Sequence, residues 1–249
     1  MAQQEKLWNS NYMKVWMANF MIFFSFMIVS PLLPLYLSET YQADKGTIGF
    51  VLSGYTLTAL LARPFSGFLV DSFPRKVVLL TSYFLFFAFF AGYLIAGTMT
   101  LFAIIRTMHG APMGSVTVAN STCAIDVLPS SRRAEGIGYY GMSNNLATSI
   151  APTVGLLIYD TIADYDIIFL VGLCAAGIGC AINATVHFPA KEIVPNKDPI
   201  SFDRFFLLKG WREGIVTVCV GLSYGVLSNY LAIYGKEMLG MTTGTGAWF

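Results

Sequence analysis

The chain has 249 residues, of which 55% are hydrophobic and 12% are charged, and its mean hydropathy is +0.63. Soluble domains carry about 25% charged residues, so this composition excludes a soluble globular protein and indicates a chain that lies mostly in lipid. The formal net charge of +1 says little by itself, because Lys and Arg sort by loop and not by total. We expect the lipid bilayer, and no nucleic acid, as a partner.

Seven apolar runs are long enough to cross the hydrocarbon core of a bilayer as helices. They cover residues 15–37, 47–70, 77–98, 101–123, 136–159, 167–188 and 215–234. Pro31 and Pro34 lie near the end of the first run, where each removes a backbone donor and predicts a bend. A longer polar stretch after the sixth run predicts three parts: a six-helix bundle (1–188), a cytoplasmic central loop (189–210), and a seventh helix with the loop that follows it (211–249).

A short charged turn joins the second and third runs. It contains the spaced residues Gly67, Asp71, Arg75 and Lys76. This pattern resembles the loop signature between the second and third helices of major facilitator superfamily transporters, although Ser72 replaces a usual basic residue and Pro74 a usual glycine. The resemblance implies a gate latch at the cytoplasmic face, in which the aspartate meets a helix of the second half of the transporter. A solvated topology signal would explain Arg75 and Lys76, but not Asp71 at that spacing.

Basic residues lie mostly on one side of the membrane in this topology. That side carries Lys6, Lys14, Arg75, Lys76, Arg132, Arg133, Lys191, Lys197, Arg204, Lys209 and Arg212, and the other carries Lys45 and Lys236. Because cytoplasmic loops are enriched in Lys and Arg, we expect the N-terminus and the Asp71 turn in the cytoplasm.

The fourth run contains an arginine several residues inside an apolar helix, which is costly in lipid. We therefore expect the side chain to face a cavity, or else to extend to the outer membrane surface. One helical face, at three- and four-residue spacing, carries Arg106, His109, Met113, Thr117 and Asn120. We interpret this face as the lining of a cavity for a substrate or protons.

The same run resembles a second motif of that family. Arg106 is followed by His109-Gly110 and Gly114, similar to a fourth-helix motif in which an arginine is followed by Gln-Gly. In the family this arginine is associated with coupling and with polarising the central cavity. His109 stands where glutamine is usual, and it could titrate near neutral pH or hydrogen-bond to a neighbouring helix. Further cavity candidates, with helix-to-helix hydrogen bonding as the alternative, are Asn19, Asn145 and Asn229.

The fifth run contains Pro152 and Gly155, which resemble the fifth-helix signature of the antiporters of the family, with Ala151 replacing a glycine. Proline and glycine permit a kink, so we predict a hinge here. The second run contains the same Pro-x-x-Gly spacing at Pro64 and Gly67. Because the copies are three runs apart, they point in opposite directions, which predicts an inverted repeat of three helices plus three.

These observations predict an all-α integral membrane protein: a major-facilitator-type N-terminal six-helix bundle, built as an inverted 3+3 repeat, plus a seventh transmembrane helix. Family members have about twelve helices, so we expect a truncated chain that needs a missing C-terminal half or a second copy. The predicted function is secondary active transport of a small solute by alternating access, with efflux by proton antiport, in the inner (plasma) membrane.

Other classes fit less well. A retinal protein needs a lysine inside the seventh run, and Lys236 lies beyond it. A membrane enzyme needs a cluster of His or Asp at membrane depth, and His109 and His187 cannot build one, so we predict no enzymatic activity. Four cysteines lack metal-ligand spacing, which predicts no metal site and no cofactor. The alternative that stays open is a non-transporting membrane fragment with a structural or regulatory role.

Overall fold

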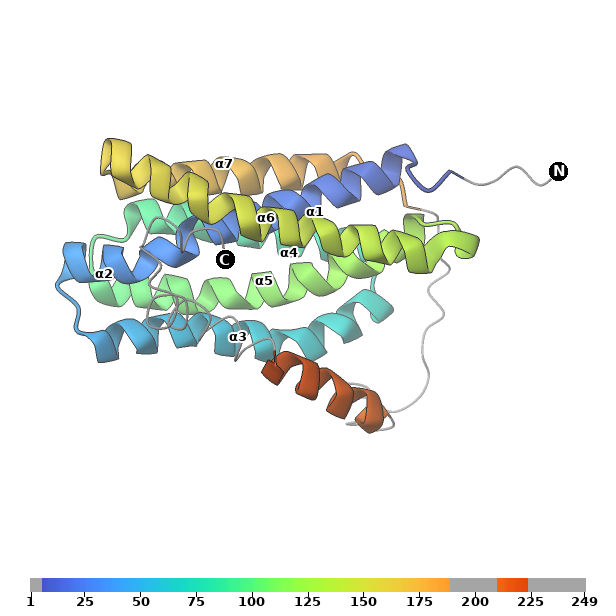
Figure 1. The fold of residues 1–249 in the computed structure, drawn as a ribbon, viewed down its shortest axis with the longest axis horizontal. Helices are drawn as coiled ribbons and strands as arrows, with labels where there is room; N and C mark the ends of the chain where they lie inside the picture. The colour runs from blue at the N-terminus through green and yellow to red at the C-terminus, as the bar shows by residue number, and fades with distance from the viewer. Residues whose placement is uncertain (1–5, 189–209, 224–249) are drawn as a thin grey trace, which may run out of the picture. The chain divides into compact units, whose positions relative to one another are not determined.

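The computed structural model describes residues 6–188 and 210–223, and every regular element in these ranges is a helix (Figure 1). The chain divides into two compact units, Met1–Asp198 and Pro199–Phe249. In the second unit, residues 211–223 are helical, and the predicted seventh span begins within this helix. The rest of that span, including Asn229, lies outside the described residues.

Six membrane-length helical segments make up the described part of the first unit. The first consists of α1 (Ser10–Val29), the 3-10 helix η1 (Ser30–Leu32) and α2 (Leu33–Tyr41). The others are α3 (Lys45–Ser72), α4 (Arg75–Ile95), α5 (Met99–Val127), α6 (Arg133–Ile162), which follows the 3-10 helix η2 (Ser130–Arg132), and α7 (Tyr165–Ala184). The predicted irregularity in the first segment is the short 3-10 helix, which contains Pro31.

Polar side chains and local backbone geometry mark the helix ends. At four helix starts, a side-chain oxygen accepts hydrogen bonds from backbone N–H groups of the first turn. These oxygens belong to Asn9, Asp44, Thr98 and Asp164. The residues directly after α2 and α6, Gln42 and Ala163, have left-handed φ angles of 53° and 54°. Both ends therefore use a conformation that glycine would adopt at lower cost.

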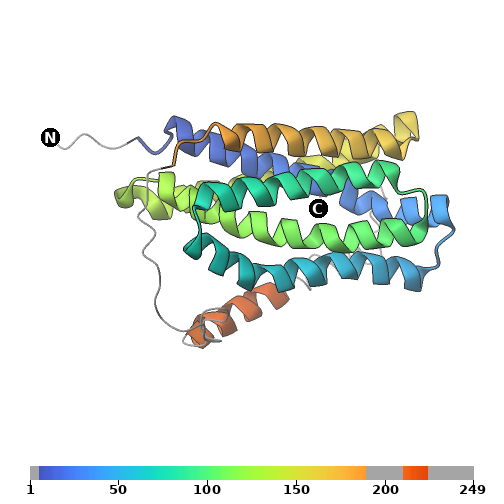
Figure 2. The same ribbon diagram turned by 180° about the vertical axis from the view of Figure 1, so that it is seen from behind.

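The helices pack in a pattern that is unchanged when the first and second triplets are exchanged. Helix α1 packs against α6 and α7, and α5 packs in the same way against α3 and α4 (Figure 2). Helix α4 also contacts α7, and α1 contacts α5. If α1 is exchanged with α5, α3 with α6 and α4 with α7, the same helix pairs are again in contact. Equivalent helices are three segments apart in the chain, so they run in opposite directions across the bundle. The predicted inverted repeat is therefore confirmed.

Glycines bring backbones into contact in two pairs that this exchange relates. A Cβ atom at Gly110 of α5 would lie 2.0 Å from the carbonyl oxygen of Tyr55 on α3. A Cβ atom at Gly155 of α6 would lie 2.5 Å from the carbonyl oxygen of Ile28 on α1. Neither contact leaves room for a side chain, so these glycines set the spacing of the helices.

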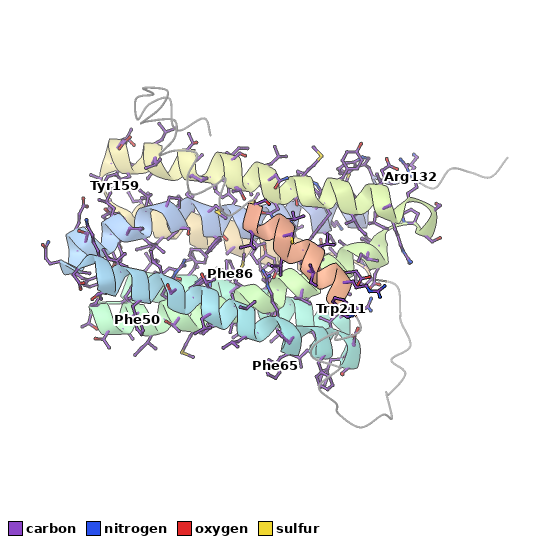
Figure 3. All side chains as sticks on the ribbon, turned by 60° about the horizontal axis from the view of Figure 1, so that its bottom comes forward. Phe50, Phe65, Phe86, Arg132, Tyr159 and Trp211 are labelled. Carbon is purple, nitrogen blue, oxygen red and sulfur yellow. The ribbon has the colours of Figure 1, made fainter. Side chains whose placement is uncertain are left out.

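The outer surface of the bundle is apolar. Helix α3 exposes Phe50 and Phe65, which point outward in Figure 3, whereas Phe86 of α4 is fully buried. Within the part of the chain that the structure describes, four segments are long and apolar enough to cross a membrane: Ser10–Tyr41, Lys45–Ser72, Arg75–Ile95 and Tyr165–Ala184. Helices α5 and α6 have 29 and 30 residues but contain more polar side chains, such as the buried Arg106. The predicted class, an all-α membrane bundle, is confirmed.

Candidate functional site

Arg106 lies inside the bundle and does not extend to its surface. The side chain is on α5, the residue is 3% exposed, and Nη1 donates a hydrogen bond of 3.0 Å to the hydroxyl oxygen of Tyr93 on α4. The guanidinium carbon is 4.0 Å from the ring centroid of Tyr55 and 5.5 Å from that of Phe26. Aromatic faces attract a cation, so these rings partly compensate the buried charge.

His109 is joined to the arginine through the same hydroxyl group. The Tyr93 hydroxyl oxygen lies 2.6 Å from His109 Nδ1, and the imidazole ring is fully buried. Since this oxygen already accepts from Arg106, the arrangement with the fewest unpaired atoms has the Tyr93 hydroxyl donating to Nδ1. His109 then carries its proton on Nε2, and its ring centroid lies 4.5 Å from that of Phe86.

Three polar atoms of this cluster are buried without an aligned hydrogen-bond partner. They are the Tyr55 hydroxyl oxygen, Arg106 Nε and His109 Nε2. Within residues 6–188 and 210–223, the only other buried side-chain atom in this state is Asn183 Oδ1. Unpaired buried polar groups are rare because each one costs the desolvation of that group. Their concentration beside a buried cation marks the Arg106 cluster, defined as Arg106, Tyr93, His109 and Tyr55, as the candidate site.

A second polar cluster holds Asn120, which the helical face had placed with Arg106, and Asn19 of α1, which was a separate cavity candidate. Asn120 donates to Asn19 Oδ1 (3.1 Å), Asn19 donates to Ser143 Oγ (2.8 Å), and the Tyr140 hydroxyl also donates to Asn19 Oδ1 (2.7 Å). Asn183 donates to Asn120 Oδ1 at 3.2 Å. This asparagine network links α1, α5, α6 and α7 through neutral groups, as the hydrogen-bonding alternative expected.

The remaining predicted site residues are dispersed. Asn145 is exposed on α6, and Gly67 is half-buried on α3. On α6, Pro152 is half-buried inside the helix and Gly155 is buried against α1. Their assignment to cavity, gate and hinge therefore stays a prediction.

At the end of the bundle that carries Asp71, the strongest ion pair is one that the sequence did not indicate. Both carboxylate oxygens of Asp126, at the end of α5, accept hydrogen bonds from Nη1 of Arg75. The carboxylate of Asp71 is 3.9 Å from Arg75, and its side chain is 79% exposed. Lys76 donates to the carbonyl oxygen of Val186 (3.0 Å), just after α7, where a cation favours the helix end. In the sequence, Asp126 could have been identified as a possible partner of a basic residue, because it is a carboxylate just after the fourth run.

The opposite end of the bundle is joined by tyrosine hydroxyls. Tyr159 of α6 and Tyr165 of α7 both donate to the carboxylate of Glu39 on α2, at 3.0 and 2.7 Å. The two triplets are therefore linked at this end through a single exposed carboxylate.

Among the described residues outside the apolar runs, Asp44 and Glu135 have lowered pKa values. Asp44 accepts from the Thr47 hydroxyl and from the backbone of Gly46 and Thr47, which holds its pKa below the usual range. Hydrogen bonds from Arg132 at 2.8 Å lower the pKa of Glu135. Both groups stabilise helix starts, since one caps α3 and the other lies in the first turn of α6.

Comparison with known proteins places these features in context. The family model for the Major Facilitator Superfamily matches residues 15–249. The staphylopine export protein of Staphylococcus aureus is 22% identical over 236 residues, covering 90% of this chain and 58% of the relative. The multidrug resistance protein MdtG of a Rahnella species is 24% identical over 246 residues, covering 94% and 59%. The quinolone resistance protein NorA of S. aureus is 24% identical over 136 residues, covering 55% and 35%.

The fold also matches a solved structure. The human organic anion transporter MFSD10 (TETRAN) superposes with a TM-score of 0.72 at 16% identity, covering 95% of this chain and 67% of that one. The chain thus spans less than three fifths of the length of the staphylopine export protein and of MdtG, at 58% and 59%.

Proposed function

Because the chain belongs to the Major Facilitator Superfamily, we propose that it forms part of a secondary transporter that exports a small organic solute by alternating access. The observation that carries this proposal is the family match over residues 15–249, together with relatives that are named as an export protein and as resistance proteins. The proposed energy source is proton antiport, and the protein acts as a carrier, not as an enzyme.

His109 is the proposed proton site. Its Nδ1 and Arg106 Nη1 share the Tyr93 hydroxyl oxygen, at 2.6 and 3.0 Å, so the two nitrogens lie no more than about 6 Å apart. If both carried a positive charge, their repulsion would amount to about 3 kcal/mol at an effective dielectric constant of 20. Protonation of His109 is therefore linked to displacement of Arg106, and such a link between a proton and a conformation is what coupled transport requires.

The two ends of the bundle supply the proposed gates. Arg75 and Lys76 connect the turn after α3 to α5 and α7, and Asp71 remains exposed for a helix of a second bundle. The proposed hinge is Pro152 with Gly155, where α6 can move against α1.

Alternating access needs a second bundle on the other side of the substrate site. In this proposal it comes from further residues of the same polypeptide or from a second copy of the chain. The proposed location is the plasma membrane, with the basic Asp71 end in the cytoplasm.

The test is flux in liposomes that contain the purified full chain. A fluorescent quinolone is loaded on one side, a pH gradient is imposed, and its movement is compared with that in liposomes carrying His109→Gln. Uphill movement that a protonophore abolishes, and that the variant lacks, supports the proposal. Absence of gradient-driven movement would favour the non-transporting alternative.

A further inference from the structure

We propose that the Arg106 cluster binds the carboxylate group of an anionic solute. This inference rests on the proposed transport function and names the chemical class of its substrate. It depends on three properties of the cluster, namely an uncompensated charge, a set of unpaired donors and a partly exposed ring that covers them.

The first property is a buried cation without a carboxylate. Arg106 is 3% exposed, and the ion pairs among the described residues involve Arg75 and Arg132 at the Asp71 end, not Arg106. Buried charges in membrane helices are normally paired. The aromatic rings offset part of the charge from above the guanidinium plane, but they do not occupy its in-plane N–H groups.

The second property is the chemistry of the unpaired atoms. Arg106 Nε–H is a donor, the Tyr55 hydroxyl is a donor, and His109 Nε2–H is a donor in the arrangement that Tyr93 favours. The backbone of Phe86 interacts with the imidazole ring without an aligned hydrogen bond. A site with surplus donors and a positive charge is complementary to a group that only accepts. An ionised carboxylate is such a group, and its two oxygens match the fork of a guanidinium.

The third property is access. Phe26 and Tyr55 are stacked with ring centroids 5.1 Å apart, and both lie over the guanidinium. Of the three rings over Arg106, which are Phe26, Tyr55 and Tyr93, only Phe26 is partly exposed. In this proposal a solute reaches the arginine by displacing the side chain of Phe26, the partly exposed ring.

The test compares benzoate with benzamide, its neutral counterpart of nearly equal shape, by calorimetric titration of the purified full chain in detergent. Benzoate fits the aromatic walls and carries the carboxylate, so we expect it to bind at least about tenfold more tightly than benzamide. Arg106→Gln should abolish this difference. Arg63→Gln, which removes an exposed arginine of α3, should leave it unchanged.

Tyr55→Phe provides the decisive variant. The hydroxyl has no partner in the structure, so its removal leaves the fold intact even if Arg106→Gln does not fold. Loss of one hydrogen bond to a charged group should weaken benzoate binding on the order of tenfold and leave benzamide unaffected. Equal binding of the two probes, no binding of benzoate, or an unchanged benzoate affinity in Tyr55→Phe would each overturn the proposal.

The outcome separates this inference from the proposed function. Benzoate binding that depends on Arg106 and Tyr55, in a chain that moves no solute in liposomes, would retain the anion site and reject transport. Gradient-driven flux in a chain that does not distinguish benzoate from benzamide would retain transport and reject the anion site.

Discussion

Replacing three buried tyrosines one at a time with phenylalanine tests the hydrogen bonds of the Arg106 cluster. Each substitution keeps the ring and removes one hydroxyl group. Tyr93 accepts from Arg106 and bonds to His109, whereas Tyr83, which precedes it on the same helix α4, donates only to the carbonyl oxygen of Ala18 at 2.7 Å. The Tyr55 hydroxyl has no partner. The three changes therefore remove two, one and no hydrogen bonds from otherwise similar sites.

The expected losses in unfolding free energy follow that order. Tyr93→Phe breaks one bond to a charged group and leaves His109 Nδ1 unpaired, which together cost about 2–3 kcal/mol. Tyr83→Phe removes one neutral bond, and such bonds in membrane proteins contribute about 0.6 kcal/mol on average, so we expect a loss of about 0.5–1 kcal/mol. Tyr55→Phe should be neutral or slightly stabilising, because the buried hydroxyl makes no bond to compensate its desolvation.

The measurement is reversible unfolding of the purified chain by SDS in mixed micelles, followed by tryptophan fluorescence. A double substitution of Tyr93→Phe with His109→Gln measures the coupling between the two side chains. If Tyr93→Phe costs no more than Tyr83→Phe, the hydroxyl does not join Arg106 to His109, and the linkage on which proton coupling depends is refuted.

Four further predictions use the same unfolding assay or its pH dependence. Gly110→Ala should destabilise by about 3 kcal/mol because its Cβ would meet the Tyr55 carbonyl, whereas Gly141→Ala on α6, with open space around it, should not destabilise. Asp126→Asn should cost about 1–3 kcal/mol because Arg75 keeps only its 3.9 Å contact with the exposed Asp71, and Asp71→Asn should cost less than about 0.5 kcal/mol. Ala163→Gly should stabilise by about 0.5–1 kcal/mol, since it relieves a φ of 54°. The lowered pKa of Asp44 adds stability above its ordinary pKa that is lost as the pH falls through the folded value, and Asp44→Asn should remove this acid dependence.

Much of the fold follows from patterns within single helices. Apolar run lengths identify the six segments of the bundle, and repeated Pro-x-x-Gly spacing indicates the inverted repeat. Three- and four-residue spacing on α5 also identifies Arg106, His109 and Asn120 as one face, and all three are buried. Such patterns are readable because helical periodicity is a local property of the chain.

Partners across helices could not be read in the same way. Tyr93 is one of many aromatic residues on α4, and its position opposite Arg106 depends on how far α4 is shifted along α5. Asp71 is the nearest carboxylate to Arg75 in sequence, yet it is Asp126, 51 residues away, whose two carboxylate oxygens accept from Arg75 Nη1. In both cases the contact depends on how two neighbouring helices are positioned along each other where small residues let them approach. Patterns within a single helix contain no information about this relative position.

The separation of the two polar clusters has a mechanistic consequence. Arg106 and Asn120 are 14 residues apart on α5, which corresponds to about 21 Å along the helix. The asparagine network contains only neutral amides and hydroxyls, so proton binding cannot alter its charge. It joins helices of both triplets nearer the Asp71 end, while the titratable His109 lies in the half nearer Glu39. In the proposed mechanism, a proton on His109 changes the electrostatics of one half of the bundle and leaves the hydrogen bonds of the other half in place. This asymmetry is what a bundle needs if it is to open at one end while it stays closed at the other.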